Sequence, residues 1–564
     1  MVNIQPQFMT LSALLANRLF RIPKYQRAYS WQKKQREDMF KDIEALRNKG
    51  GMNHFMATVV GLRRDMITIV TDEYRVIDVV DGQQRITTLV MLLKAIEQKL
   101  DRRLNTEDRL GNELQELLVK PDELCLILLQ TNHDTSEYFA NYLRSGKRTK
   151  VAEATTLADR ELLSAMEHCE EFVDKWNDRI ELLRIIKNQL TFIFHEIDEE
   201  ATVCTVFEVL NNRGLRVSWI DRLKSMLMAV AFQNGQGNVK ENIQELHNTW
   251  GSIYKTIGLR QGMSAEALKF AATLKATTRP SKPLGDEAAV ELLVGLCQSS
   301  AVEAINLSKW LLNVVEAVDR FLKDTRRSKA ITGIVQARLL AVAIILSEYS
   351  DDKSNLLKLW EKASFRVFGL CRKDARTSVG EYVRLAWDIV NNKDLLSGDV
   401  EERIKNLSEG KEHSIEWAIV QLENENCYEG WEDELRYLLF RYEEHLAESK
   451  NQRFTNEQWN RIWEASAAQS IEHICPESKG ATERVGSSEK RIFVHRLGNL
   501  VLLPPGLNSQ LQDKEPKNKV ESYKKTGLLC TTEVAHMIQD NGWSPQQVEK
   551  RERNLIEWIK TTWV

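Results

Sequence analysis

The chain lacks paired cysteines, a long apolar run and a strong excess of either charge. Its 8 cysteines are scattered and none form a CxxC, so neither a zinc ribbon nor a disulfide framework is expected. No stretch approaches the roughly 18 uninterrupted apolar residues of a membrane span, and the N-terminus has no basic segment ahead of an apolar core. These absences predict a cytoplasmic protein with reduced thiols and no membrane partner.

The charge balance excludes a further class. A net charge of -3 and a pI near 6.4 argue against a wholly basic nucleic-acid coat. An enzyme that acts on nucleic acid is still allowed, because phosphate contacts need only a local basic patch. At 564 residues the chain is too long for one ordinary core, so roughly two to four domains are expected.

The hydrophobic pattern predicts an α+β protein that is predominantly helical. Strand-like runs at 54–62, 66–70 and 74–80 precede an apolar helix at 86–100. From about residue 105 to about 450, apolar residues recur at three- and four-residue steps, which is typical of helices.

Three domains are therefore expected. The first, 1–230, mixes strands and helices, and the second, 231–450, is a helical scaffold. In the third, 451–564, two short apolar segments precede a Pro-Pro-Gly turn and a basic helix, which is the order of a ββα unit.

The third domain carries polar residues at the ends of its apolar segments. His473 follows Glu472, Asn499 precedes the run LVLL, and Asn508 follows the Pro-Pro-Gly turn. A phosphodiester hydrolase needs a base to activate water, and a neutral imidazole suits that role near pH 7. It also needs a divalent cation, which Asn and carboxylate oxygens can hold. Taken singly, these residues could equally form a surface His–Glu pair, a strand cap and a common turn.

Lysines follow these residues and would supply local positive potential for a DNA backbone. They are Lys514, Lys517, Lys519, Lys524 and Lys525.

Together these residues resemble a known family. EHI-x-P, GNL-x-LL, LN and a Lys-rich helix are similar to the C-terminal His-Me finger (HNH) nuclease domain of GmrSD-type, modification-dependent restriction endonucleases. The resemblance implies a ββα-metal fold in which His473 is the general base, Asn499 braces the loop and Asn508 ligates the metal. Glu472 would either ligate the metal or only orient its neighbours, and Lys519 matches the family's helix lysine.

His495 has no firm counterpart in the family. We expect it to be structural or to contact phosphate.

In the first domain the run VIDVV ends at Asp81-Gly82, and a helix follows at once. A helix start offers free backbone N–H groups for phosphate, and Gly82 permits close approach. Arg85 can hold two phosphate oxygens in a fork, and Asp81 could hold Mg²⁺ on a nucleotide, with Asp78 as a weaker helper. No GxxxxGK[ST] is present, so any such cradle is not a Walker A loop. Without a ligand, Asp81 would simply cap the helix.

Three motifs extend this site and resemble the partner domain of the same family. They are IPKYQRAYSW (22–31), IDVVDGQQRITTL (77–89) and VFEVLNNRGLRVSWIDRLK (206–224). The resemblance implies a ParB-like α/β domain that binds and often hydrolyses nucleoside triphosphate, regulates the nuclease and helps to read the modified target. The expected nucleotide-binding residues are Gln26, Arg27, Asp81, Gly82, Gln83, Gln84, Arg85, Asn212 and Arg213.

The sequence therefore predicts a DNA endonuclease of an anti-phage restriction system. Its partners would be double-stranded and modified phage DNA, a divalent metal (Mg²⁺, with Mn²⁺ as the alternative) and a nucleotide. GTP, CTP and ATP are not distinguished, and the oligomeric state, a homodimer included, is left open. Two alternatives remain: an NTPase switch with an inactive nuclease, and a nucleotide-gated DNA-binding regulator.

Overall fold

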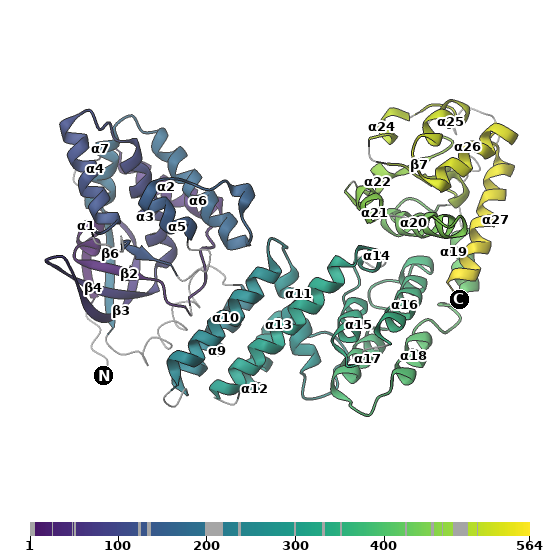
Figure 1. Ribbon diagram of the computed structural model, residues 1–564, viewed down its shortest axis with the longest axis horizontal. Helices are drawn as coiled ribbons and strands as arrows, with labels where there is room; N and C mark the ends of the chain where they lie inside the picture. The colour runs from purple at the N-terminus through teal and green to yellow at the C-terminus, as the bar shows by residue number, and fades with distance from the viewer. Residues whose placement is uncertain are drawn as a thin grey trace. The chain divides into compact units, whose positions relative to one another are not determined.

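The computed structural model describes residues 6–563 except 25, 48, 50–51, 122–125, 132–136, 198–217, 235–237, 298–299, 330–332, 350–351, 424–425, 453–455, 465, 478–493, 505 and 512. The chain forms two compact units, Met1–Ala272 with Gly285–Glu316 and Thr273–Leu284 with Ala317–Val564. Helices predominate in both, with a mixed sheet in the first unit (Figure 1), so the predicted fold class is confirmed. The boundary between the two units falls inside the helical region expected at 231–450. The three domain ranges expected from the sequence therefore stay predictions.

The sheet of the first unit has six strands in the order β1-β6-β3-β4-β2-β5. β3 pairs antiparallel with β4 and parallel with β6, while β2 runs parallel to β4. The strands are β1 (Pro6–Thr10), β2 (Arg18–Arg21), β3 (His54–Ile69), β4 (Asp72–Asp81), β5 (Leu129–Gln130) and β6 (Leu190–Ile197).

The strands predicted at 54–62 and 66–70 are one strand, β3. Its pairing with β4 shifts register between Val60 and Gly61 and again between Arg63 and Met66. A register shift of this kind lets the polar residues Arg63–Asp65 stay in the strand, whereas the sequence pattern suggested a break.

Helix α3 (Gln83–Lys99) is the core of the first unit. Nearly all of its residues from Ile86 to Glu97 are buried, because ITTLVMLLKAI is apolar on every face. It packs against α4 and α6 and also touches α7. The other helices around the sheet are α1 (Leu11–Leu15), α2 (Lys33–Glu44), α4 (Asn105–Leu118), α5 (Glu137–Ser145), α6 (Leu157–Asp174) and α7 (Arg179–Asn188).

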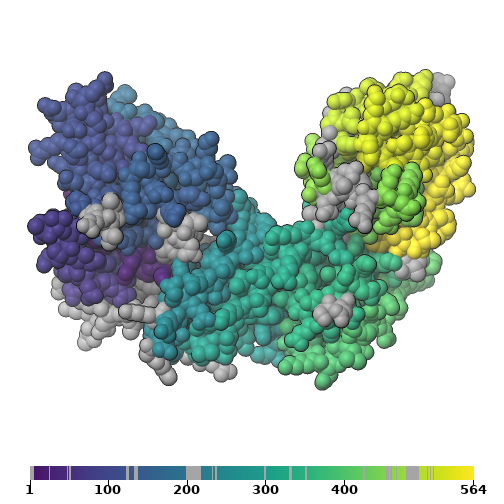
Figure 2. All heavy atoms as spheres, in the orientation of Figure 1, coloured from purple at the N-terminus to yellow at the C-terminus, as the bar shows by residue number. Residues whose placement is uncertain are grey.

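Long helices follow the sheet along the chain. They are α9 (Trp219–Gln233), α10 (Val239–Ile257), α11 (Met263–Leu274), α12 (Asp286–Leu296) and α13 (Ala301–Lys323). α9 packs against α10 and α12, and the boundary between the two units falls within α13. In Figure 2 the atoms of this segment, coloured blue-green to teal, form one continuous surface.

The second unit begins with a helical layer centred on α15, which is buried on almost every side and packs against α17. Its elements are α14 (Thr325–Ser328), α15 (Val335–Leu346), α16 (Lys353–Ser364), α17 (Val379–Asn391), α18 (Ser397–Asn406), α19 (Ile415–Leu422) and α20 (Glu432–Ser449). Among the described helices of the whole chain, none combines the length and apolar composition that crossing a membrane requires.

The last part of the second unit holds a two-stranded antiparallel ribbon, β7 (Ile471–His473) with β8 (Leu500–Leu502). A 3-10 turn, η4 (Leu497–Asn499), immediately precedes β8. The helices α20 and α26 pack on β8. The helices are α21 (Asn456–Trp463), α22 (Ala467–Ser470), α24 (Asn508–Leu511), α25 (Pro516–Lys524), α26 (Leu529–Asn541) and α27 (Pro545–Thr562). Two strands followed by helices is the element order predicted for this region.

Candidate functional site

The imidazole of His473 lies at the end of β7 beside a second histidine and a carboxylate. Its Nε2 is 3.1 Å from Nδ1 of His495 and 3.5 Å from Oε1 of Glu477. The ligand atoms of the three side chains all lie within 4.8 Å of one another. Burial is the main cause of a pKa lowered to about 3 for His473, and the charges of His495 and Lys519 contribute to the same shift. The ring is therefore neutral near pH 7 and can accept a proton or a metal ion.

An aromatic ring holds the two histidines in place. Tyr428 lies edge-on to His473, with ring centroids 4.6 Å apart, and stacks on His495 at an interplanar angle of 4°. The backbone N–H of Cys427 donates to the carbonyl of His495 at 2.8 Å. Residues preceding α20 thus fix His495 against His473, a contact that the sequence pattern did not predict.

Glu472 is on the opposite face of β7 from His473, because successive side chains of a strand alternate. Its carboxylate is buried and accepts hydrogen bonds from Lys519 Nζ at 2.5 Å and from Tyr523 O–H at 3.3 Å. Burial raises the pKa of Glu472 although both partners lower it. Lys519 also donates to the carbonyl of His473 at 2.8 Å. These contacts favour the orienting role over the ligand role that the sequence left open.

Asn499 is fully buried, and its amide joins the two ends of the loop between β7 and β8. Its Oδ1 accepts from Cys475 N–H at 2.9 Å and from Trp543 Nε1–H at 3.0 Å. Its Nδ2 donates to the carbonyls of Cys475 and Val494 at 3.1 and 2.9 Å. These hydrogen bonds fix the backbone that follows His473, which is the role expected of Asn499 from the sequence.

The remaining predicted nuclease residues differ in their placement. Asn508 is the first residue of α24, and its side chain lies outside what the structure describes. Four of the predicted lysines are exposed. Lys517 and Lys524 are on α25, and Lys514 and Lys525 lie just outside its two ends. Lys519 is fully buried and paired with Glu472, so it does not add to the surface potential as the sequence suggested.

In the first unit β4 ends at Asp81, and Gly82 opens α3 with φ +88°. A Cβ at Gly82 would lie 3.0 Å from Val59 Cγ2 and 3.2 Å from the Thr58 carbonyl oxygen, so the close approach expected of this glycine is present. Burial raises the pKa of Asp81, and the charges of Arg85 and Arg27 oppose that rise.

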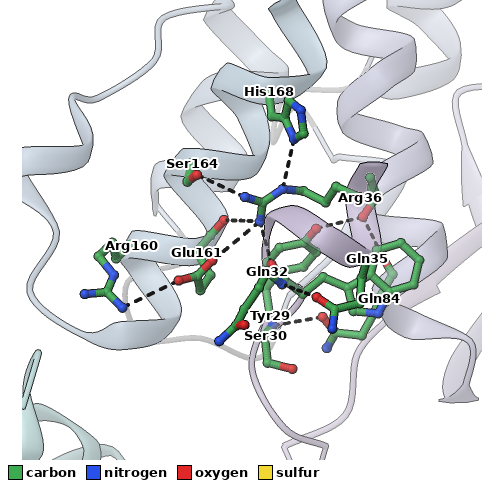
Figure 3. Close-up of polar contacts among 12 residues, drawn as sticks. Tyr29, Ser30, Gln32, Gln35, Arg36, Gln84, Arg160, Glu161, Ser164 and His168 are labelled. Carbon is green, nitrogen blue, oxygen red and sulfur yellow. Dashed lines mark hydrogen bonds and ion pairs between the residues drawn. The ribbon is translucent and has the colours of Figure 1, made fainter. Parts of the chain in front are cut away.

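The two glutamines of DGQQR fasten the extended segment 26–30 to the start of α3. Gln83 Nε2 donates to Gln26 Oε1 at 3.1 Å, and Gln26 Nε2 donates to the Val80 carbonyl at 2.6 Å. Gln84 Oε1 accepts from the Ser30 N–H at 2.9 Å (Figure 3). The far end of the segment is held by a buried arginine: Arg36 donates to the Trp31 carbonyl at 2.5 Å and to Ser164 Oγ on α6 at 3.0 Å.

Two arginines remain near the DGQQR turn. The Arg85 guanidinium lies 5.7 Å from the Trp31 ring centroid. Burial lowers the pKa of Arg27, while Asp221 and Asp81 raise it. Asp78, the weaker magnesium candidate, is already engaged by Arg21 Nε at 2.6 Å and Arg64 Nε at 2.7 Å.

The start of α9 adds polar groups that we did not single out from the sequence. Asp221 accepts from Tyr254 O–H at 2.5 Å, and Lys224 Nζ donates to the Gln26 carbonyl at 3.2 Å. Both residues belong to the motif that ends in WIDRLK, and their three-residue spacing on a helix was the available signal. Asn212 and Arg213, from the same motif, lie outside the described residues.

Comparison with known protein families identifies both ends of the chain. The N-terminal domain of the GmrSD restriction endonuclease matches residues 11–228, and the C-terminal domain of GmrSD restriction endonucleases matches residues 413–558. The chain belongs to the GmrSD restriction endonuclease family. No curated protein matches it. As a GmrSD family member it is a DNA endonuclease of a restriction system in phage defence, so that part of the prediction is confirmed.

Proposed function

We propose that this GmrSD family endonuclease hydrolyses DNA at an HNH-type, metal-dependent centre on β7, β8 and α25, with His473 as the general base. The observation that supports this most directly is the environment of His473. Its imidazole is mostly buried, neutral near pH 7 and adjacent to the metal-type donors His495 and Glu477. An ordinary surface histidine would be solvated and would lack these neighbours.

The residues of the chain have separate parts in this reaction. His473 accepts a proton from the water whose oxygen attacks the phosphorus atom, and the bond from phosphorus to the leaving oxygen breaks. Lys519 binds the carbonyl of His473 itself, and Asn499 binds the backbone of Cys475 two residues later. Glu472 keeps Lys519 in position and so orients the end of β7.

The donors around His473 suit a divalent ion. The carboxylate of Glu477 is an oxygen donor of the kind that Mg²⁺ and Mn²⁺ prefer, and His495 adds a nitrogen donor. The amide oxygen of Asn508 is a further proposed ligand, carried by the family resemblance alone. When bound, the metal stabilises the negative charge that develops on the phosphate and leaving oxygens. Glu472 is the weaker ligand of the two acids, because Lys519 and Tyr523 already bind its carboxylate.

His473→Ala tests the proposal. Loss of a general base lowers cleavage by about 10²–10⁴-fold, while the protein should stay folded and nucleotide binding should stay unchanged. His536→Ala is the matched control, because His536 is an exposed histidine of the same unit on α26. Nicking by His473→Ala at the wild-type rate would refute the assignment.

We further propose that the first unit contains a ParB-like nucleotide site at DGQQR that regulates cleavage. The support is a cluster of opposite charges at a helix start, formed by Arg27, Asp81 and Arg85 with Asp221 and Lys224 nearby. The same cluster keeps a second function open, an NTPase switch in which cutting is secondary.

Phosphate release from GTP, CTP and ATP, with and without DNA, separates these functions. The switch requires turnover that Arg85→Ala abolishes, whereas a nucleotide-gated binder releases no phosphate above background. The proposed target, modified phage DNA, is tested by cleavage of matched modified and unmodified phage DNAs with Mg²⁺ or Mn²⁺ and each nucleotide.

A further inference from the structure

The second unit contains a cavity of about 620 Å³ between the end of α13, α14, α16, α20, α21 and the end of α27. Its volume is typical of sites for small molecules of nucleotide size. The histidine cluster of the nuclease centre does not line it. Nothing in the proposed reaction uses this cavity.

Cationic side chains outnumber acidic ones around the cavity. The cations are Lys323, Arg326, Arg327, Lys358, Lys362 and Arg441, and the acids are Asp324, Glu361 and Glu448. Two acids pair with these cations without lining the cavity, Glu444 with Arg326 and Arg441 and Asp319 with Lys323, and the cations remain in excess by one. Clustered positive charge with too few counter-charges raises the local concentration of anions.

A buried carboxylate fixes two of the arginines. Glu361 is 5% exposed, accepts a hydrogen bond from Tyr437 O–H, and lies 3.6 Å from Arg327 Nε and 3.5 Å from Arg441 Nε. The carboxylate therefore holds two guanidinium groups at one wall of the cavity before any ligand arrives. Side chains held in this way lose little entropy on binding an anion.

Two lysines on α16 provide charge that the fold does not neutralise. Lys358 and Lys362 are one turn apart, both line the cavity, and neither forms a salt bridge with any residue that the structure describes. Like charges at this spacing slightly destabilise a helix. Stability of the unit alone therefore does not explain the pair.

A buried donor without a partner also borders the cavity. Trp563 is 1% exposed, and its Nε1–H makes no hydrogen bond within the described part of the chain. An unsatisfied buried donor destabilises the fold, and a hydrogen bond to a ligand oxygen would remove that cost.

We propose that this cavity binds a small phosphorylated molecule through a chain of two or more phosphate groups. Phosphate oxygens match both the arginine forks and the lysine ammonium groups. A DNA duplex fits less well, because it presents charge along an extended line whereas these cations surround one cavity.

Binding of inorganic pyrophosphate to the full chain, measured calorimetrically in EDTA and low salt, tests this proposal. Lys358→Ala/Lys362→Ala should weaken binding at least about tenfold, since one charged hydrogen bond is worth that much. Both lysines are exposed, so folding should be kept. Lys393→Ala/Lys411→Ala removes two exposed lysines of the same unit outside the cavity and should bind like the wild type. In an Arg85→Ala background, which removes a proposed phosphate ligand at DGQQR, the α16 double substitution should weaken pyrophosphate binding by the same factor, and this separates the two sites.

Two results would overturn the proposal. One is the absence of saturable pyrophosphate binding by the wild type, or binding that the α16 double variant leaves unchanged. The other is that the protein shows no pyrophosphate site while the double variant binds a short DNA duplex more weakly than the wild type does. That result would mean that the two lysines contact DNA.

Discussion

The Nζ atom of Lys519 lies 2.5 Å from Oε1 of Glu472, and both side chains are buried. The two residues are on α25 and β7, so the pair joins the helix to the strand that ends at His473. Because each charge depends on the other, this contact links the stability of the unit to the position of the proposed base.

Lys519→Met should destabilise the second unit. The substitution keeps the length of the side chain but leaves the Glu472 carboxylate buried without its cation, which typically costs about 3–5 kcal/mol. Chemical unfolding measures the change. Lys517→Ala, on the exposed face of the same helix, is the control and should change little. Adding Glu472→Gln to Lys519→Met should restore part of the loss, and a fully stable single variant would contradict the argument.

Gly82→Ala should both destabilise the first unit and weaken nucleotide binding. Alanine at φ +88° is strained by about 1–2 kcal/mol, and its Cβ would press on Val59 and Thr58. Gly295→Ala is the opposite control: Gly295 is within α12 with open space around it, so alanine should stabilise by about 0.5–1 kcal/mol. Equal melting temperatures for the two variants would show that alanine at position 82 is not strained.

Asp81→Asn should raise thermal stability near pH 8. Burial raises the pKa of Asp81, so the folded state binds a proton more readily than the unfolded state. This group therefore weakens folding as pH rises through the window from the ordinary Asp pKa of about 3.9 to the raised value. The gain from asparagine should be about 2 °C above that window and should vanish below it.

Melting curves at several pH values measure this gain. Asp65→Asn replaces an exposed aspartate of β3 and should show no such dependence. A gain for Asp81→Asn that is the same at every pH would count against the raised pKa.

The elements that could be predicted from sequence are those fixed by local pattern. Helix α3 follows from an apolar run long enough for a helix, and β7 and β8 follow from short apolar segments. The long strand β3 was misread, because its polar residues 63–65 look like a loop until β4 is seen beside them.

The contacts within the sites depend on residues far apart in the chain. Glu472 and Lys519 are separated by 47 residues, and His473 and His495 by 22. No periodicity relates such pairs, so the family resemblance named His473 and Asn499 but not their neighbour His495. For the same reason Gln83 and Gln84 were expected to bind nucleotide, whereas in the structure their side chains hydrogen-bond Gln26, Ala28 and Ser30.

His495→Ala should slow cleavage by about 10–100-fold. Nδ1 of His495 contacts Nε2 of His473, so the variant removes the neighbour that orients the proposed base together with a proposed nitrogen donor to the metal. A positioning role predicts a lower kcat with KM for DNA unchanged, whereas simple misfolding would change both and lower the melting temperature. His495→Gln offers an amide in place of the imidazole and should recover part of kcat. If His495→Ala cleaves as fast as the wild type, the second histidine only packs on Tyr428.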